Sequence, residues 1–209
     1  YAGEDNVLGQ ANVRLIDINK NNVIGIDEAD SYGQDDIVSQ SELHLPVGRK
    51  IIFKMRSQDV LHSAYMPHFR AQMNCVPGMI TQFAFVPNMT TAEMREDEGI
   101  IAKVDKINKI RAKKSIDLVA KGEEALEPYT FDYLLLCNKI CGASHYNMQM
   151  KIVVDTPEDF KAWLSEKPTL SSQWAEANAP VPAPTPELEV TEPMEVVIDT
   201  TKVVAQIIK

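Results

Sequence analysis

Two cysteines, a histidine and a methionine fall within twelve residues of one another, in the run Cys137-Asn138-Lys139-Ile140-Cys141-Gly142-Ala143-Ser144-His145-Tyr146-Asn147-Met148. Thiolate, imidazole and thioether groups are soft ligands that suit copper. A mononuclear blue-copper site needs one cysteine, so the second cysteine supplies a thiolate that could bridge two metals. The spacing therefore favours a pair of copper ions. Buried structural thiols are common in protein cores, but they leave this spacing unexplained.

A second imidazole has to come from outside this run, and the chain has three other histidines. His62 is the candidate, because it ends a predicted strand that starts at Ile51. His44 lies in an apparent strand and His68 in a turn, so both are more typical of surface or hydrogen-bonded histidines. Cys75 is adequately explained as a small buried thiol and is given no role.

The ligand run and two upstream segments resemble subunit II of haem-copper cytochrome c oxidases. The run has the pattern Cys-x-x-x-Cys-Gly-x-x-His-x-x-Met, and the upstream segments are Asp59-Val60-Leu61-His62-Ser63 and Val76-Pro77-Gly78. The resemblance covers residues 40–90 and 129–165, and so complete a ligand string is improbable by chance. It implies a binuclear copper centre (CuA) with these ligands: His62, Cys137, Lys139 through its backbone carbonyl, Cys141, His145 and Met148.

What such a subunit does is also implied by the resemblance. CuA accepts electrons from cytochrome c, or from a haem domain, and passes them to haem in subunit I, where oxygen reduction drives proton pumping. The chain is then part of an enzyme, the terminal oxidase, but itself only transfers electrons. We expect it on the outer, periplasmic face of the inner membrane, in contact with subunit I and other oxidase subunits.

The chain departs from the family pattern at three points. Lys139 replaces an acidic residue that helps to bind magnesium, so no magnesium site is expected through this side chain. The family's N-terminal transmembrane hairpin and its aromatic electron-entry stretch are missing, and the longest apolar runs are far shorter than the roughly 18–20 residues that span a bilayer. Because the chain starts at Tyr1 without a signal peptide, we expect a fragment or a processed product.

Two other functions have to be weighed. The CuA domain of a nitrous oxide reductase has a similar ligand loop, but Gly142 and the segment 59–63 favour the oxidase. A copper carrier would need exposed, exchangeable ligands, whereas this loop is expected to be buried and rigid. The net charge of −9 argues against nucleic acid as a partner.

The elements that would position the ligands are mainly strands. Alternating apolar residues over 41–66, and strand-like runs at 81–86, 131–136 and 149–154, predict a mainly β fold, which the resemblance specifies as a cupredoxin-like Greek-key β-sandwich. Residues 91–127 form a charged, amphipathic helical insertion with Ile100, Val104, Ile107 and Arg111 on one face. A short helix starts at Pro157. The predicted domain is 1–165, followed by a proline-rich, extended C-terminal tail and docking segment over 166–209.

Both ends of the chain are acidic. Residues 1–36 carry eight acids against two bases, which could help to attract a basic cytochrome c, although such runs are usually solvated surface. Asp17, Asn19, Asn21, Ile24 and Glu28 imitate an EF-hand loop, but Asn22 occupies the position of the invariant glycine. A polar acidic loop explains this segment better than calcium binding does.

Overall fold

The computed structural model describes residues 1–3, 5–19 and 22–177. The first 177 residues form one compact unit, Tyr1–Ala177. Most of the predicted C-terminal tail, residues 178–209, lies outside the described residues, as does Asn21 of the EF-hand-like segment. Among the described residues, no helix is both long enough and apolar enough to cross a membrane.

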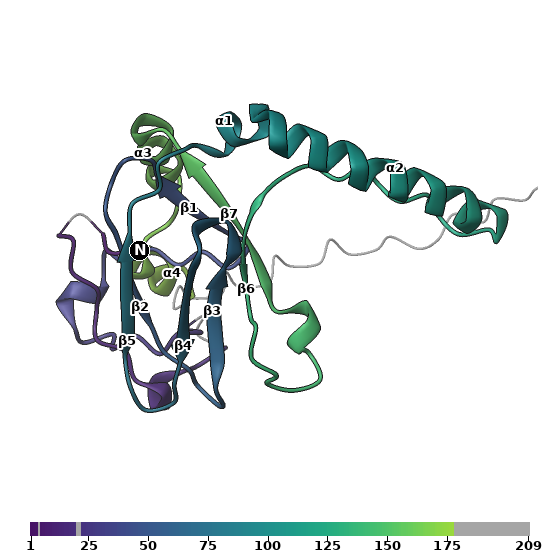
Figure 1. Cartoon of the computed structure of the whole chain (residues 1–209). Coiled ribbons are helices and arrows are strands. Elements are labelled where there is room, and N and C mark those ends of the chain that lie inside the picture. The colour runs from purple at the N-terminus through teal and green to yellow at the C-terminus, as the bar shows by residue number, and fades with distance from the viewer. Residues whose placement is uncertain (4, 20–21, 178–209) are drawn as a thin grey trace, which may run out of the picture. The chain divides into compact units, whose positions relative to one another are not determined.

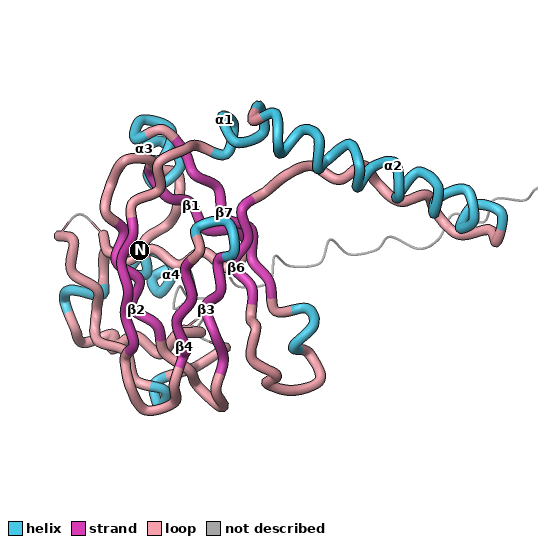
Figure 2. Tube along the Cα trace, viewed as in Figure 1, coloured by secondary structure: helices cyan, strands magenta, loops and turns pink. Residues whose placement is uncertain are grey.

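Two β-sheets form the body of the unit (Figures 1 and 2). The larger sheet has the strand order β1-β7-β6-β3-β4, in which β1 runs parallel to β7 and the other pairs are antiparallel. The smaller sheet pairs β2 with β5. The bounds are β1 (Glu42–Pro46), β2 (Ile51–Met55), β3 (His62–Met66), β4 (Ala71–Cys75), β5 (Thr81–Phe85), β6 (Tyr133–Leu136) and β7 (Gln149–Asp155).

The core lies between these sheets. Ile152 and Val154 are fully buried and stand two residues apart on β7, as the period of a half-buried strand requires. The smaller sheet covers this core with phenylalanines; Phe53 of β2 stacks on Phe83 and Phe85 of β5, with ring centroids 5.5 and 5.6 Å away. Burial of such large rings is the main favourable term in the packing of the two layers. The predicted β-sandwich is therefore confirmed.

The predicted helical insertion is also confirmed, as α1 (Thr91–Glu96) and α2 (Glu98–Ala120). Thr90 and Glu93 form a capping box at the start of α1, and the Asp97 side chain caps α2. Ile100 and Val104 of α2 pack against the core of the sandwich.

Beyond its first turns, α2 packs on the segment that leads back to β6, and the two form a hairpin (Figure 1). The Asn108 side chain donates to the carbonyl of Tyr129 and accepts from its N–H, at 3.0 and 2.7 Å. Arg111 donates to the carbonyl of Glu127. Side chains of α2 thus satisfy backbone groups of a segment that has no strand partner of its own.

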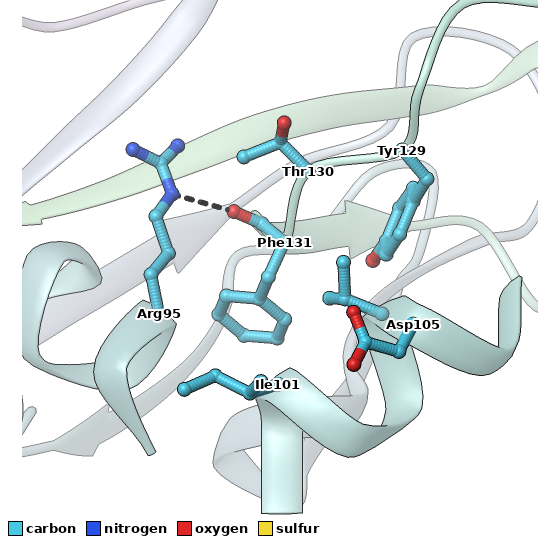
Figure 3. Close-up of a pocket in the computed structure, with 7 residues that line it drawn as sticks. Arg95, Ile101, Asp105, Tyr129, Thr130 and Phe131 are labelled. Atoms are coloured by element: carbon cyan, nitrogen blue, oxygen red, sulfur yellow. Dashed lines mark hydrogen bonds between the residues drawn. The ribbon is translucent and has the colours of Figure 1, made fainter. Parts of the chain in front are cut away.

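A small crevice opens where this hairpin meets the sandwich (Figure 3). Its volume is about 150 Å³, and Arg95, Ile101, Tyr129 and Phe131 are among the residues that line it. The Arg95 guanidinium donates to the carbonyl of Phe131 at 2.9 Å, which ties α1 to the segment that leads into β6.

Two helices complete the unit at its C-terminal side. The predicted helix at Pro157 is α3 (Pro157–Ser165), where Trp163 stacks on the ring of His44. It is followed by α4 (Leu170–Ala177), whose Leu170 and Trp174 form a second small core with Ile26.

Candidate metal centre

The cysteine-rich run forms the loop between β6 and β7. Cys137 follows β6 directly, and its N–H donates to the carbonyl of Met148 at 3.0 Å, which closes the loop at its base. Gly142 has a φ of +138°, a conformation that side-chain-bearing residues rarely adopt, so this loop path requires glycine. A short 3₁₀ turn, His145–Asn147, leads into β7.

The adjacent strand β3 carries the second histidine to this loop. Tyr65 of β3 pairs with Leu136 of β6, so the first residue of β3, His62, lies beside the residues that follow β6. Ligand atoms of His62, Cys137 and Cys141 all lie within 4.8 Å of one another. Residues 75 positions apart in the sequence are thus brought into one cluster by strand pairing.

The remaining residues of the predicted ligand set surround the two sulfurs. The Sγ atoms of Cys137 and Cys141 are 3.7 Å apart. On the Cys141 side lie the Nδ1 atom of His145 at 3.5 Å and the Sδ atom of Met148 at 3.2 Å. On the Cys137 side, the carbonyl oxygen of Lys139 is 3.3 Å from Sγ. All six predicted residues therefore meet at one place.

His62 is held by Asp59, a neighbour to which the sequence alone assigns no role. Its Nε2 atom lies 2.7 Å from Oδ1 of Asp59. Its Nδ1 atom is buried and has no hydrogen-bond partner among the described residues. The Asp59 carboxylate raises the pKa of His62, against the effect of burial, and the nearby Cys137 thiol adds to this rise. The sequence signal was the spacing of an acid and a histidine three residues apart.

The two thiols have different tendencies to ionise. Burial opposes ionisation of Cys137, yet backbone hydrogen bonds at Lys139 and Ser63, with His62 beside it, lower its pKa to about 6. Burial and the neighbouring Cys137 sulfur raise the pKa of Cys141. The thiolate is the form that binds metals. Cys137 therefore forms its thiolate easily, whereas Cys141 releases its proton when a metal binds.

The residues that were excluded as ligands lie elsewhere or point to other partners. His44 is buried near the far end of β7, where its Nδ1 atom bonds to Asp155. His68 packs against the rings of Phe131 and Tyr133. Cys75 pairs with His62 across β3 and β4, so it lies closer to the cluster than the sequence indicated, but it is not one of the three clustered groups.

The donor set fits copper in its chemistry. Two thiols, two imidazoles, a thioether and a carbonyl converge. The sulfur and imidazole groups among them bind copper in preference to hard cations such as magnesium and calcium. The buried, unpartnered Nδ1 atom of His62 is a further sign, because buried polar atoms almost always have a partner.

A two-layered β-sandwich with a soft-donor loop at the end of β6 defines a cupredoxin-like domain with a candidate metal centre. Residues 20–94 match the family model of the periplasmic domain of cytochrome c oxidase subunit II. The alternative cytochrome c oxidase subunit 2 of Bradyrhizobium diazoefficiens is 34% identical over 170 residues, which are 81% of this chain and 46% of that protein. The cytochrome c oxidase subunit 2 of Thermostichus vulcanus is 26% identical over 143 residues, which are 68% of this chain and 31% of that protein.

Among solved structures, the chain is similar to the periplasmic domain of subunit II of the cytochrome oxidase of Bradyrhizobium japonicum. The identity is 17%, the TM-score is 0.39, and the match covers 60% of this chain and 62% of that one. The chain spans about half, or less, of the curated relatives that it matches. The predicted relationship to cytochrome c oxidase subunit II is confirmed by the family model and these relatives.

Proposed function

We propose that this chain is the copper-binding, electron-accepting domain of a cytochrome c oxidase, with a binuclear CuA centre. The observation that carries the proposal is the convergence of His62 with all the donors of the loop 137–148 around two sulfurs 3.7 Å apart. A single metal would leave several of these donors unused.

The donors surround the sulfur pair. The Lys139 carbonyl lies near Cys137, His145 and Met148 lie near Cys141, and the ligand atom of His62 lies within 4.8 Å of both sulfurs. Two copper ions that share both thiolates would each then have an imidazole and one weaker ligand. When bound, such a centre supplies a one-electron acceptor and donor.

The protein contributes rigidity and position. His62 starts a strand that is paired on both sides, and the loop is closed at its base by the bond between Cys137 and Met148. Ligands held in this way change position little when the charge on the metals changes, which keeps electron transfer fast.

The surface around the ligand loop suits contact with redox partners. Ile140 and Tyr146 are 93% and 88% exposed, and Met148 is 39% exposed, so the loop presents apolar groups next to the donors. Contacts of this kind bury aromatic and aliphatic side chains at protein interfaces. We propose subunit I as the electron acceptor and cytochrome c, or a haem domain, as the donor.

The location follows from the same proposal. Subunit I is in the membrane, so this domain would sit on the outer, periplasmic face of the inner membrane, attached through an N-terminal hairpin of the whole subunit. Oxygen reduction and proton pumping would take place in subunit I. The chain would thus serve a haem-copper terminal oxidase without carrying the oxygen chemistry itself.

The test is to load the chain with copper, count the metal per chain and record its electron paramagnetic resonance spectrum. One unpaired electron shared equally by two copper nuclei gives seven hyperfine lines, whereas one copper gives four. Two coppers per chain with seven lines are expected. One copper with four lines, or copper that chelators strip at once, would contradict the proposal and favour a mononuclear site or a carrier.

A further inference from the structure

The strongest polar contact of the His62 ring is with a carboxylate. Nε2 lies 2.7 Å from Oδ1 of Asp59, a normal hydrogen-bond distance. An ionised carboxylate can only accept hydrogen bonds, so the proton of this bond belongs to the histidine. The neutral ring therefore has its proton on Nε2 and a free lone pair on Nδ1.

The free lone pair points to a ligand. Nδ1 of His62 is buried and has no hydrogen-bond partner within the described part of the chain. The ring belongs to the group whose ligand atoms lie within 4.8 Å of one another, with the two thiols. A buried acceptor without a partner, next to two sulfur ligands, is an atom prepared for a metal.

Asp59 itself is well placed to fix this arrangement. It lies in the turn that precedes β3, three residues before His62, and the hydroxyl of Ser57 bonds to the carbonyl of Val60 in the same turn. Pairing with Cys75 fixes the backbone of His62, so the main remaining freedom is rotation of its side chain. The carboxylate removes that freedom.

We propose that Asp59 is a positioning residue of the metal centre, whose carboxylate holds the His62 ring in the tautomer and orientation that present Nδ1 to the two thiols. The proposal rests on the proposed function, because it assigns Asp59 to the same copper site. It adds a residue that does not touch the metal but controls how strongly the metal is held. A hydrogen-bonded carboxylate also makes the imidazole a more basic ligand.

The chain offers a matched control in a second carboxylate–histidine pair. Asp155 bonds to Nδ1 of His44 near the end of β7, whereas the ligand loop joins the start of β7. Asp155→Asn therefore alters a similar hydrogen bond without touching the cluster. Asp59 is 66% exposed, so Asp59→Ala and the isosteric Asp59→Asn should both fold, which circular dichroism can verify.

The first measurement needs no metal. Long-range proton–nitrogen correlation spectra of the ¹⁵N-labelled, metal-free chain report the tautomer of each histidine, at a pH well above the ordinary histidine pKa. His62 of the unmodified chain and of Asp155→Asn should carry its proton on Nε2 alone. Asp59→Ala should show a mixture of both tautomers. An unchanged tautomer in Asp59→Ala would overturn the proposal.

The second measurement uses copper and competing chelators. Loss of such a supporting carboxylate typically lowers metal affinity by about 10–100-fold. Asp59→Ala should show this loss, Asp59→Asn a smaller one because its amide oxygen still accepts the bond, and Asp155→Asn none. Equal copper affinity in Asp59→Ala and the unmodified chain would overturn the proposal. If the unmodified chain binds no copper, the proposed function fails, and the metal-free tautomer measurement alone decides whether Asp59 orients the His62 ring.

Discussion

The sulfur atoms of Cys137 and Cys141 lie 3.7 Å apart, on the two sides of the bend at Lys139. This is longer than a disulfide bond of about 2.05 Å, and the three cysteines are free. The pair is close enough for two metals to share both sulfurs. The number of copper ions that the site binds should therefore depend on both sulfurs.

Removal of one sulfur should turn a binuclear centre into a mononuclear one. In Cys141→Ser the proposed bridge loses one of its two sulfurs, and His145 and Met148 lose the sulfur beside them. We expect the copper content to fall from two ions to one per chain, and the spectrum to change from seven hyperfine lines to four. Elemental analysis and electron paramagnetic resonance measure the two quantities.

Cys75→Ser is the control for this change. Cys75 is also half-buried, and it pairs with His62, but it lies outside the clustered ligand atoms. Its substitution should leave two coppers and seven lines. Retention of two coppers in Cys141→Ser, or their loss in Cys75→Ser, would show that the bridging pair has been assigned wrongly.

The side chain at 139 should be dispensable for copper. The Lys139 carbonyl lies 3.3 Å from the Cys137 sulfur, and any residue except proline keeps a similar backbone. Lys139→Ala should bind as much copper as the unmodified chain, with an unchanged hyperfine pattern. A fall in copper content would mean that the ammonium group, rather than the carbonyl, supports the site.

The helical insertion should be stabilised by Asn108. Its side chain makes two hydrogen bonds to Tyr129, so Asn108→Ala leaves a partly buried N–H and carbonyl without partners. The expected loss of stability is about 1–3 kcal/mol. Faster hydrogen exchange over residues 124–131, with unchanged exchange in β3, would show the effect.

A variant on the same helix separates local packing from a general loss of helix stability. Ile110 is 69% exposed on α2, so Ile110→Ala removes no buried contact. It should leave exchange in residues 124–131 as it is. Equal effects of Asn108→Ala and Ile110→Ala would count against a specific role for the Asn108 bonds.

The sequence predicted the ligand loop because its donors are close together along the chain. Cys137, Cys141, His145 and Met148 lie in one connection between two strands, and their meeting needed no tertiary information. His62 was a candidate from its place at the end of a predicted strand, but only the resemblance assigned it as a ligand. The pairing of Tyr65 with Leu136, which brings it to the loop, is a long-range contact that no local pattern contains.

Other features depended on contacts that the sequence did not reveal. The strand Ala71–Cys75 has few β-branched or aromatic residues, and it forms because β3 supplies its hydrogen bonds. The partly buried position of Cys75 beside His62 follows from that strand. Asp59 is part of the sequence motif, but its role could be inferred only from the structure. The evidence is the 2.7 Å contact between its Oδ1 atom and Nε2 of His62, together with the unpartnered Nδ1 atom of the same ring.

The stability of the domain should depend on pH through His68, which lies just beyond the end of β3 opposite to His62. Burial against Phe131 and Tyr133 lowers the pKa of His68 below its ordinary value of 6.5, and Lys103 lowers it further. The unfolded chain then binds a proton at a higher pH than the folded chain does. Stability is therefore lost as the pH falls below 6.5, and the loss levels off below the folded pKa.

His68→Phe isolates this contribution, because phenylalanine fits among the same rings and does not titrate. Urea unfolding of both proteins at several pH values gives the difference in unfolding free energy. The unmodified chain should lose stability relative to His68→Phe as the pH falls from above 6.5. A difference that does not change with pH, or that favours the unmodified chain in acid, would mean that His68 is not held neutral by its surroundings. The aromatic cluster beside α2 would then be open enough to hydrate a charged ring.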